Sequence, residues 1–158
     1  MATKKKSWRE KIDDDKDLPK SIKLDAKAAA RWGGTTMTIA APREVDALMR
    51  AVPKGRVTTI NQLRTALARQ HGTETTCPIT TGIFSWIAAH AAAEGRAAGE
   101  KDTTPYWRTL KSGGELNPKY PGGVSALKRK LAAEGHTIVQ RGKRTVVRDF
   151  EQALHSPR

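Results

Sequence analysis

The chain is poor in the residues that redox chemistry, metal binding and membrane insertion require. It has one cysteine, Cys77, which excludes an internal disulfide framework and fits a reducing compartment. Its four histidines show no metal-ligand spacing, so we expect no metal and no cofactor. No apolar run approaches the roughly 18 residues that a membrane span needs, and no apolar stretch follows the N-terminal lysines as it would in a secretory signal. These absences predict a soluble, cytoplasmic protein.

Acidic residues are scarce relative to basic ones. The 158 residues include 29 lysines and arginines but 16 aspartates and glutamates, which gives a formal net charge of +13. Residues 103–158 alone hold 11 basic and 4 acidic residues, and therefore a charge of +7. Such an excess favours a polyanionic partner, of which nucleic acid is the commonest, although a merely soluble basic protein can have the same composition.

The chain divides into three predicted parts. Residues 1–41 form a charged N-terminal arm with a short helical turn and a strand, residues 42–136 form the folded domain, and residues 137–158 form a basic β-hairpin and a tail. The mixed charges of the arm predict a solvated segment that is anchored at Trp8. Its lysines, Lys4 to Lys6, either touch DNA phosphates or only keep the protein soluble.

Three segments of the folded domain have the apolar spacing of amphipathic helices, namely residues 42–52, 59–72 and 78–90. A short turn joins the last two, and Pro78 opens the third segment, an arrangement typical of a helix-turn-helix. Residues 137–147 predict a hairpin with a basic tip, the shape of a wing. The predicted fold class is therefore α/β, mainly α, with a winged-helix-like helix-turn-helix domain and a small β-hairpin wing.

The third helical segment has two unlike faces. One face, mainly apolar, carries Ile79, Ile83, Trp86, Ile87 and His90, and the outer face carries only small, uncharged side chains. The small residues are Thr80, Thr81, Gly82, Ser85 and Ala89. Small residues let a helix approach a DNA groove closely while hydroxyls bind phosphates. Packing of this face against another helix is the alternative.

Five sequence blocks carry a resemblance to a known family. They read Val-Pro-Lys-Gly-Arg-Val-Thr-Thr at 52–59, Cys-Pro at 77–78, Pro-Tyr-Trp-Arg at 105–108, Tyr-Pro-Gly-Gly at 120–123 and Ala-Glu-Gly-His at 133–136. In this order, over residues 42–136, the blocks resemble the alkylguanine DNA alkyltransferases and their alkyltransferase-like relatives, which lack the reactive cysteine. The family keeps Pro-Cys-His-Arg where this chain has Pro-Tyr-Trp-Arg.

The resemblance implies a DNA-repair protein without the family's chemistry. Tyr106 takes the position of the nucleophile and Trp107 that of the general-base histidine. A phenol with a pKa of about 10 is a poor nucleophile at neutral pH, and an indole nitrogen donates a hydrogen bond but does not accept one. We therefore expect no alkyl transfer. Glu134 matches the glutamate that orients the histidine, and with a tryptophan there we expect it to make only a helix-end contact.

The resemblance also implies how DNA is read. The family inserts this helix into the minor groove and fills the gap left by a flipped base with an arginine, whose position falls on Gly82 here. The family's base-rotating tyrosine falls on Ile60, a second departure. We expect a base pocket in which two adjacent aromatic rings stack on an extruded base. Its residues are Tyr106, Trp107, Arg108 and Tyr120. The alternative is that Tyr106 and Trp107 are strand residues, one of them packed inward.

The expected function is non-catalytic binding of double-stranded DNA by a monomer, which senses alkylated bases by nucleotide flipping and hands the site to other repair proteins. Two alternatives stay open: a plain winged-helix DNA-binding or nucleoid protein without lesion sensing, and an alkyltransferase that uses Cys77. The residues expected to contact DNA are Arg56, Thr58, Thr59, Thr80, Thr81, Ser85, Lys128, Arg129, Lys130, Arg141, Lys143 and Arg144.

Overall fold

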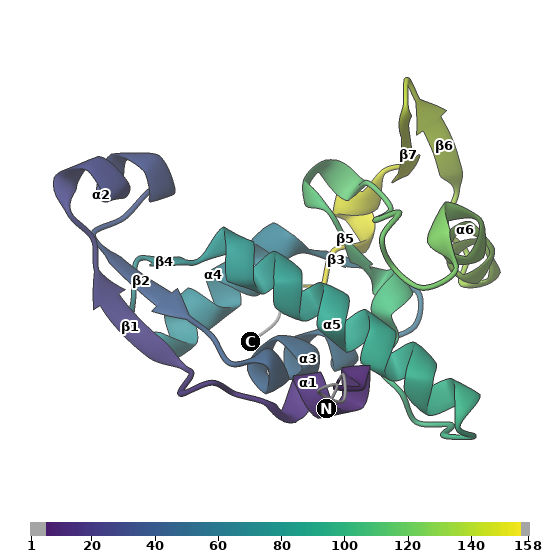
Figure 1. Ribbon diagram of the computed structural model, residues 1–158. Helices are drawn as coiled ribbons and strands as arrows, with labels where there is room; N and C mark the ends of the chain where they lie inside the picture. The colour runs from purple at the N-terminus through teal and green to yellow at the C-terminus, as the bar shows by residue number, and fades with distance from the viewer. Residues whose placement is uncertain (1–5, 156–158) are drawn as a thin grey trace.

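The computed structural model describes residues 6–155, so Lys4 and Lys5 of the expected DNA-contacting arm lie outside the described residues. Its helices are α1 (Trp8–Asp13), α2 (Ala26–Trp32), α3 (Pro42–Arg50), α4 (Ile60–His71), α5 (Pro78–Ala97) and α6 (Gly123–Ala133). Its strands are β1 (Lys20–Lys23), β2 (Thr36–Ile39), β3 (Thr58–Thr59), β4 (Thr75–Thr76), β5 (Thr109–Leu110), β6 (Ile138–Arg141) and β7 (Arg144–Val147). Short 3-10 turns occur at η1 (Tyr106–Arg108), η2 (Ser112–Gly114) and η3 (Phe150–Ala153). The result is a mixed α/β fold with small sheets (Figure 1).

Helix α5 runs through the middle of the molecule, and α1, α3 and α4 all pack against it (Figure 1). The apolar residues that recur every three or four positions on α3 and α4 form the centre of the core. Val45, Met49, Leu63 and Leu67 are fully buried there. The periodicity of residues 42–52 and 59–72 therefore correctly predicts two helices and the sides that they bury.

The ends of the central helices follow from local chemistry. Thr59 caps α4, because its hydroxyl accepts the backbone N–H of Gln62 at 3.3 Å. Gly72 ends α4 in the left-handed conformation, with a φ of 68°. Cys77 occupies the N-cap of α5 but makes no side-chain capping bond there, and Pro78 is the first helical residue. The helix continues to Ala97, beyond the predicted end at residue 90.

The start of the N-terminal segment is folded onto the core. Helix α1 packs against α5 and α3, and Ile12 is buried in the core. The Trp8 ring stacks on His90 at a centroid distance of 4.5 Å. Lys6 pairs with Asp14 at 2.6 Å. The predicted anchor at Trp8 is confirmed, and no residue of 13–27 is buried, but the anchor is a whole helix, because a few well-placed apolar side chains suffice to dock it.

Strands of the N-terminal segment also reach across the predicted boundary at residue 42. Strand β2 pairs antiparallel with β1 and parallel with β4, and Met37 lies opposite Thr75. Helix α2 stands apart at this end of the molecule (Figure 1). Residues 36–39 confirm the predicted strand, whereas its pairing with β4 links two segments that are distant in sequence.

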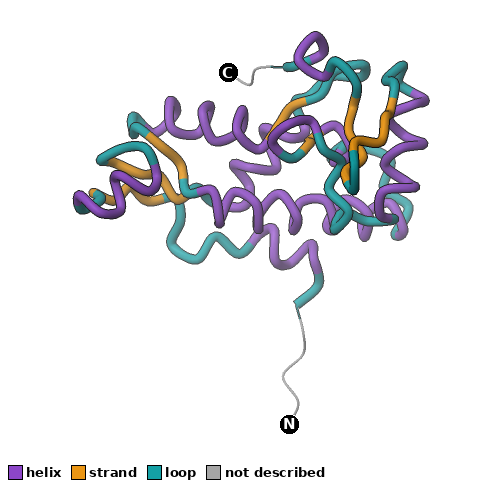
Figure 2. Tube along the Cα trace, turned by 90° about the horizontal axis from the view of Figure 1, so that it is seen from above, coloured by secondary structure: helices purple, strands orange, loops and turns teal. Residues whose placement is uncertain are grey.

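The C-terminal third returns to the core twice. Strand β5 pairs in parallel with β3, Thr109 opposite Thr58, and β6 and β7 form the predicted antiparallel hairpin. After the hairpin, the Val57 N–H donates to the Ala153 carbonyl at 3.0 Å, and the His155 N–H donates to the Val57 carbonyl at 2.7 Å. Figure 2 shows the hairpin side of the molecule opposite the β1–β2 side. Within residues 6–155, no helix is long and apolar enough to cross a membrane.

Candidate nucleic-acid interface

The faces of α5 differ from the prediction at most positions, although Ile87 of the predicted inner face is buried, and Thr80 and Gly82 of the predicted outer face are not. Thr81, Ser85 and Ala89 are buried, whereas Ile79 and Ile83 are 58% and 45% exposed. The buried hydroxyls are satisfied within the helix, since Thr81 donates to the Cys77 carbonyl at 2.7 Å and Ser85 to the Gly82 carbonyl at 2.9 Å. The small residues thus let neighbouring helices pack closely, which was the alternative interpretation. The prediction that this face is the outer one is wrong.

Four threonines and serines that were expected to contact DNA are not on the surface. Besides Thr81 and Ser85, Thr58 and Thr59 are buried in strand β3. The Thr59 hydroxyl caps α4, and that of Thr58 has no partner among the described residues. None of the four can reach a phosphate in this structure. Thr80 remains half-buried, and its hydroxyl donates to the Cys77 carbonyl at 3.4 Å.

The basic residues expected at the interface are better placed. Lys128 and Arg129 are exposed on α6, and Arg141, Lys143 and Arg144 are exposed on the β6–β7 hairpin. Within residues 6–155, none of these five makes an ion pair. Two neighbouring elements therefore present cations that are free to bind phosphates.

Arg56 and Lys130, the other two basic candidates, differ from this group. Arg56 is exposed, and its guanidinium donates to the Gln152 carbonyl at 3.4 Å. Lys130 is half-buried, and its ammonium lies 4.6 Å from the centre of the Trp107 ring. Burial, together with Arg96 and Arg129, lowers the pKa of Lys130 below its ordinary value. Lys130 thus contacts the aromatic site.

The four predicted pocket residues do come together, but they form a packed cluster. Tyr106 and Tyr120 are both buried, and the Tyr106 ring meets those of Trp107 and Tyr120 edge-on at 5.4 Å and 6.1 Å. Burial raises the pKa of Tyr106, and it raises that of Tyr120 to about 12. Both phenols are therefore neutral at physiological pH. Tyr106 is packed inward, as the alternative interpretation held, but Tyr106 and Trp107 are not strand residues, because residues 106–108 form a 3-10 turn and β5 begins at Thr109.

Glu134 holds the next two residues of this cluster. Its carboxylate accepts the Trp107 indole N–H at 3.1 Å and two Arg108 donors at 2.9 Å and 2.7 Å. Arg108 also donates to the Val52 carbonyl at 2.8 Å, which ties the cluster to the end of α3. The prediction that Glu134 makes only a helix-end contact is wrong, because an indole can donate to this carboxylate as a protonated imidazole nitrogen would.

The electrostatics of this junction favour the ionised glutamate. Burial by itself raises the pKa of Glu134, but hydrogen bonds from Arg108 and Trp107 outweigh it and bring the pKa below its ordinary value. The side chains of Arg108 and Glu134 are only 14% and 8% exposed. The junction is thus a buried ion pair whose hydrogen bonds fix the orientation of Trp107.

Three cationic side chains lie close to the Trp107 ring. Besides Lys130, the guanidinium carbons of Arg96 and Arg108 lie 5.6 Å and 5.5 Å from its centre. The sequence argument missed Arg96, because it ended the helix before this residue. Residues 91–98 are rich in alanine, the best helix former, so this composition could have predicted that α5 continues past residue 90.

Comparison with known proteins gives a likeness in structure but none in sequence. No family model matches the chain, and no curated protein matches it. Solved structures that do match include S. pombe Atl1 in complex with damaged DNA containing O6-carboxymethylguanine, and S. pombe ATL in complex with DNA. In each case the TM-score is 0.51, the sequence identity is 19%, and the match covers 73% of this chain and 94% of the other. The chain has the fold of Atl1. At the level of the fold, the expected alkyltransferase-like resemblance is confirmed.

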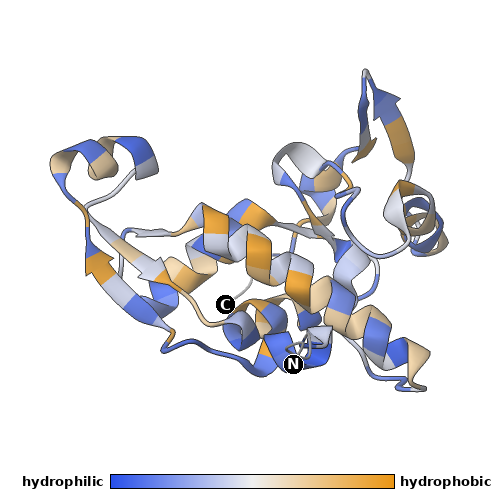
Figure 3. Ribbon diagram, viewed as in Figure 1, coloured by the Kyte–Doolittle hydropathy of each residue, from blue (hydrophilic) through white to orange (hydrophobic). Residues whose placement is uncertain are grey.

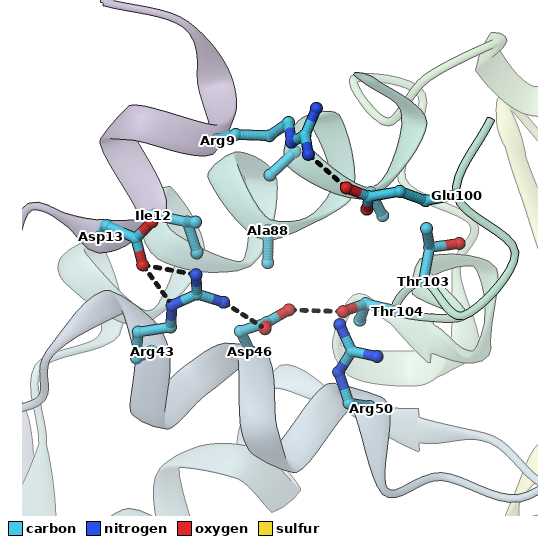
Figure 4. Close-up of a pocket in the computed structure, with 12 residues that line it drawn as sticks. Arg9, Ile12, Asp13, Arg43, Asp46, Arg50, Ala88, Glu100, Thr103 and Thr104 are labelled. Atoms are coloured by element: carbon cyan, nitrogen blue, oxygen red, sulfur yellow. Dashed lines mark hydrogen bonds and ion pairs between the residues drawn. The ribbon is translucent and has the colours of Figure 1, made fainter. Parts of the chain in front are cut away.

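A second polar cluster lies between α1, α3 and α5 and shares no residue with the aromatic cluster (Figure 4). The Asp46 carboxylate accepts the Thr104 hydroxyl at 2.6 Å and pairs with Arg43 at 3.6 Å. Arg43 also binds Asp13, and Arg9 binds Glu100. Its acids and bases pair with each other, so the cluster fastens α1 to the core. Within residues 6–155, no group of histidine, cysteine and acidic residues could hold a metal ion.

Proposed function

We propose that this protein binds double-stranded DNA non-covalently and recognises alkylated or otherwise distorted bases without transferring the alkyl group. The observation that carries the proposal is the set of exposed, unpaired cations on α6 and the β6–β7 hairpin, in a fold shared with an Atl1 that was solved on damaged DNA. The net charge of +13 adds a long-range attraction to any duplex.

In this proposal the fold acts as a winged helix. Helices α4 and α5 are the helix-turn-helix, and α5 is the recognition helix. The β6–β7 hairpin is the wing, and its tip places Arg141, Lys143 and Arg144 beside one another for the phosphate backbone. Helix α6 contributes Lys128 and Arg129 to the same partner.

The absence of alkyl transfer follows from the aromatic cluster. The position of the family's thiolate holds the buried phenol of Tyr106, whose raised pKa keeps it protonated. Trp107 cannot accept a proton, and its N–H is committed to Glu134. The cluster therefore supplies neither a nucleophile nor a base, and its residues serve binding and positioning.

Recognition of a flipped base requires the cluster to open. Tyr106 and Tyr120 are buried, and Lys130 covers the Trp107 ring, so a base can stack on Trp107 only after this cation moves away. Opening costs free energy and should limit the preference for a lesion to about tenfold, or about 1.4 kcal/mol. The closed cluster equally favours a second candidate function, duplex binding without lesion sensing.

Matched duplexes with and without an O6-alkylguanine distinguish the two candidates. Fluorescence anisotropy at low salt should give binding to both duplexes, with tighter binding to the alkylated one. Equal affinities would favour the protein without lesion sensing. No binding to either duplex at low salt would remove DNA as the partner and refute the proposal.

A further inference from the structure

The outer side of α5 carries an exposed apolar stripe. Within residues 6–155, only Ile22, Ile79 and Ile83 are large hydrophobic side chains that are markedly exposed, at 37%, 58% and 45%. Two of the three lie one turn apart on α5, on the helix face opposite its buried small residues. Figure 3 shows hydrophobic turns of α5 on the side that faces the viewer. Paired apolar side chains of this kind mark an interaction surface more often than single ones.

The stripe forms one wall of a shallow groove. Gly82 lies between the two isoleucines, and a Cβ atom there would meet nothing within 4 Å, so the helix backbone itself can be approached. Trp86 continues the stripe by one turn. The facing wall is the loop that contains Lys111, Asn117, Pro118 and Lys119. The groove therefore has an apolar wall on α5 and a polar, basic wall opposite.

The basic wall is held in place. The Asn117 side chain accepts the Lys119 N–H at 3.0 Å, and the Lys119 carbonyl lies 3.1 Å from the His90 ring nitrogen of α5. The Lys119 ammonium makes no ion pair within residues 6–155, whereas Lys111, whose side chain is half exposed, pairs with the largely buried Glu115 at 3.5 Å. No acidic residue lines the groove. Its charge suits a polyanion, and its apolar wall suits a flat, uncharged surface such as the face or edge of a base.

We propose that Ile79 and Ile83 act as an apolar wedge that enters a bound duplex and partly unstacks a base step, while Lys111 and Lys119 bind the flanking phosphates. This inference rests on the proposed DNA binding. Proteins that bend DNA insert aliphatic side chains between base steps in the minor groove, where unstacking is compensated by the contacts that bending allows. A second copy of this chain is a poor occupant, since each copy carries a charge of +13 and the two would repel.

A wedge recognises deformability and not a particular base. Flexible pyrimidine–purine steps and damaged or mispaired sites unstack at lower cost than stiff A-tracts. The closed aromatic cluster need not open for this kind of recognition. The wedge thus gives the protein a preference for distorted DNA that is independent of Trp107.

The test uses the full chain, the double variant Ile79→Ser/Ile83→Ser, both single variants, and Ile22→Ser as a control. Ile22 is an exposed isoleucine of strand β1, away from the groove. The duplexes carry 2-aminopurine beside a TA step and a fluorophore pair at their ends. We expect the wild-type chain and Ile22→Ser to raise 2-aminopurine fluorescence and to bring the ends closer. The double variant should lose both signals and bind about 10-fold more weakly, with an unchanged salt dependence.

The possible outcomes separate the two proposals. No binding by the wild-type chain at low salt would overturn DNA binding and the wedge together. Binding by the double variant with full affinity and unchanged fluorescence would overturn the wedge alone. Sedimentation of the same samples tests whether a second copy of the chain occupies this face. A wild-type dimer that becomes a monomer in the double variant would make the face an interface between two copies and would overturn the wedge. Thermal melting checks that each variant is folded, and the single variants supply the comparison if the double one is not.

Discussion

Replacing Glu134 with alanine should be one of the most damaging single substitutions in the C-terminal half of the protein. The change removes the acceptor for Trp107 and for two donors of Arg108, and it leaves a guanidinium that is only 14% exposed with the Val52 carbonyl as its remaining partner. Breaking a buried ion pair from one side costs about 3–5 kcal/mol. Since some water can reach Arg108, we expect about 3 kcal/mol, at the lower end of that range.

A matched control is the exposed ion pair of Arg50 with Asp102, at 3.3 Å. The Asp102 side chain is fully exposed, so Asp102→Ala should leave the free energy of unfolding almost unchanged. Glu134→Gln, which keeps an acceptor and loses the charge, should fall between the two. Urea unfolding followed by tryptophan fluorescence measures all three. A cost below about 1 kcal/mol for Glu134→Ala, as for an exposed pair, would refute the view that this carboxylate holds the cluster together.

Four further predictions concern chemistry, charge and pH. Incubation with methylated duplex should add no methyl group to the protein, and an adduct seen by intact mass spectrometry, on Cys77 or elsewhere, would contradict the non-catalytic proposal. If about five phosphates are neutralised, log affinity should fall with log salt at a slope of about −4 to −5. Neutralising Lys128 and Arg129 should make this slope shallower by about 2, whereas neutralising a matched pair of basic residues on β1 should leave the slope unchanged. Trp107→Ala should reduce a preference for the alkylated duplex to the part that the Ile79–Ile83 wedge supplies and should leave binding to undamaged duplex nearly intact, whereas an unchanged preference would show that Trp107 takes no part in lesion recognition. Folding lowers the pKa of Glu134 from its ordinary value of 4.5. The ionised Glu134 therefore stabilises the fold fully above pH 4.5, and this stabilisation is lost as the pH falls through the pKa of the folded protein. The difference in unfolding free energy between the wild type and Glu134→Gln should accordingly become smaller in acid.

The sequence predicts helices better than it predicts which side of a helix is buried. Apolar spacing located α3 and α4 correctly. On α5, however, periodicity shows that two faces differ without showing which one meets the core. The bulky isoleucines looked like the inner face, yet close packing of α5 against its neighbours required the small residues there, and Ile79 and Ile83 were left outside.

Long-range contacts explain the other differences between prediction and structure. The fastening of α1 depends on pairs such as Arg9 with Glu100 and Trp8 with His90, whose members are far apart in sequence. In the aromatic cluster, the resemblance brought Tyr106 to Arg108 and Tyr120 together correctly. The resemblance did not reveal that the Trp107 indole would donate a hydrogen bond to Glu134, because that bond depends on side-chain geometry and not on residue type alone.

The return of the C-terminal segment to Val57 has a consequence for how the protein is made. Val57 lies in the first half of the chain and is fully buried, and within residues 6–155 its backbone N–H and carbonyl pair with residues 153 and 155. A nascent chain cannot complete this region until synthesis has passed those residues, and until then it carries unpaired backbone groups beside an open core. Fragments that stop after the hairpin should therefore be prone to aggregation and to proteolysis, even though every helix of the core is present in them.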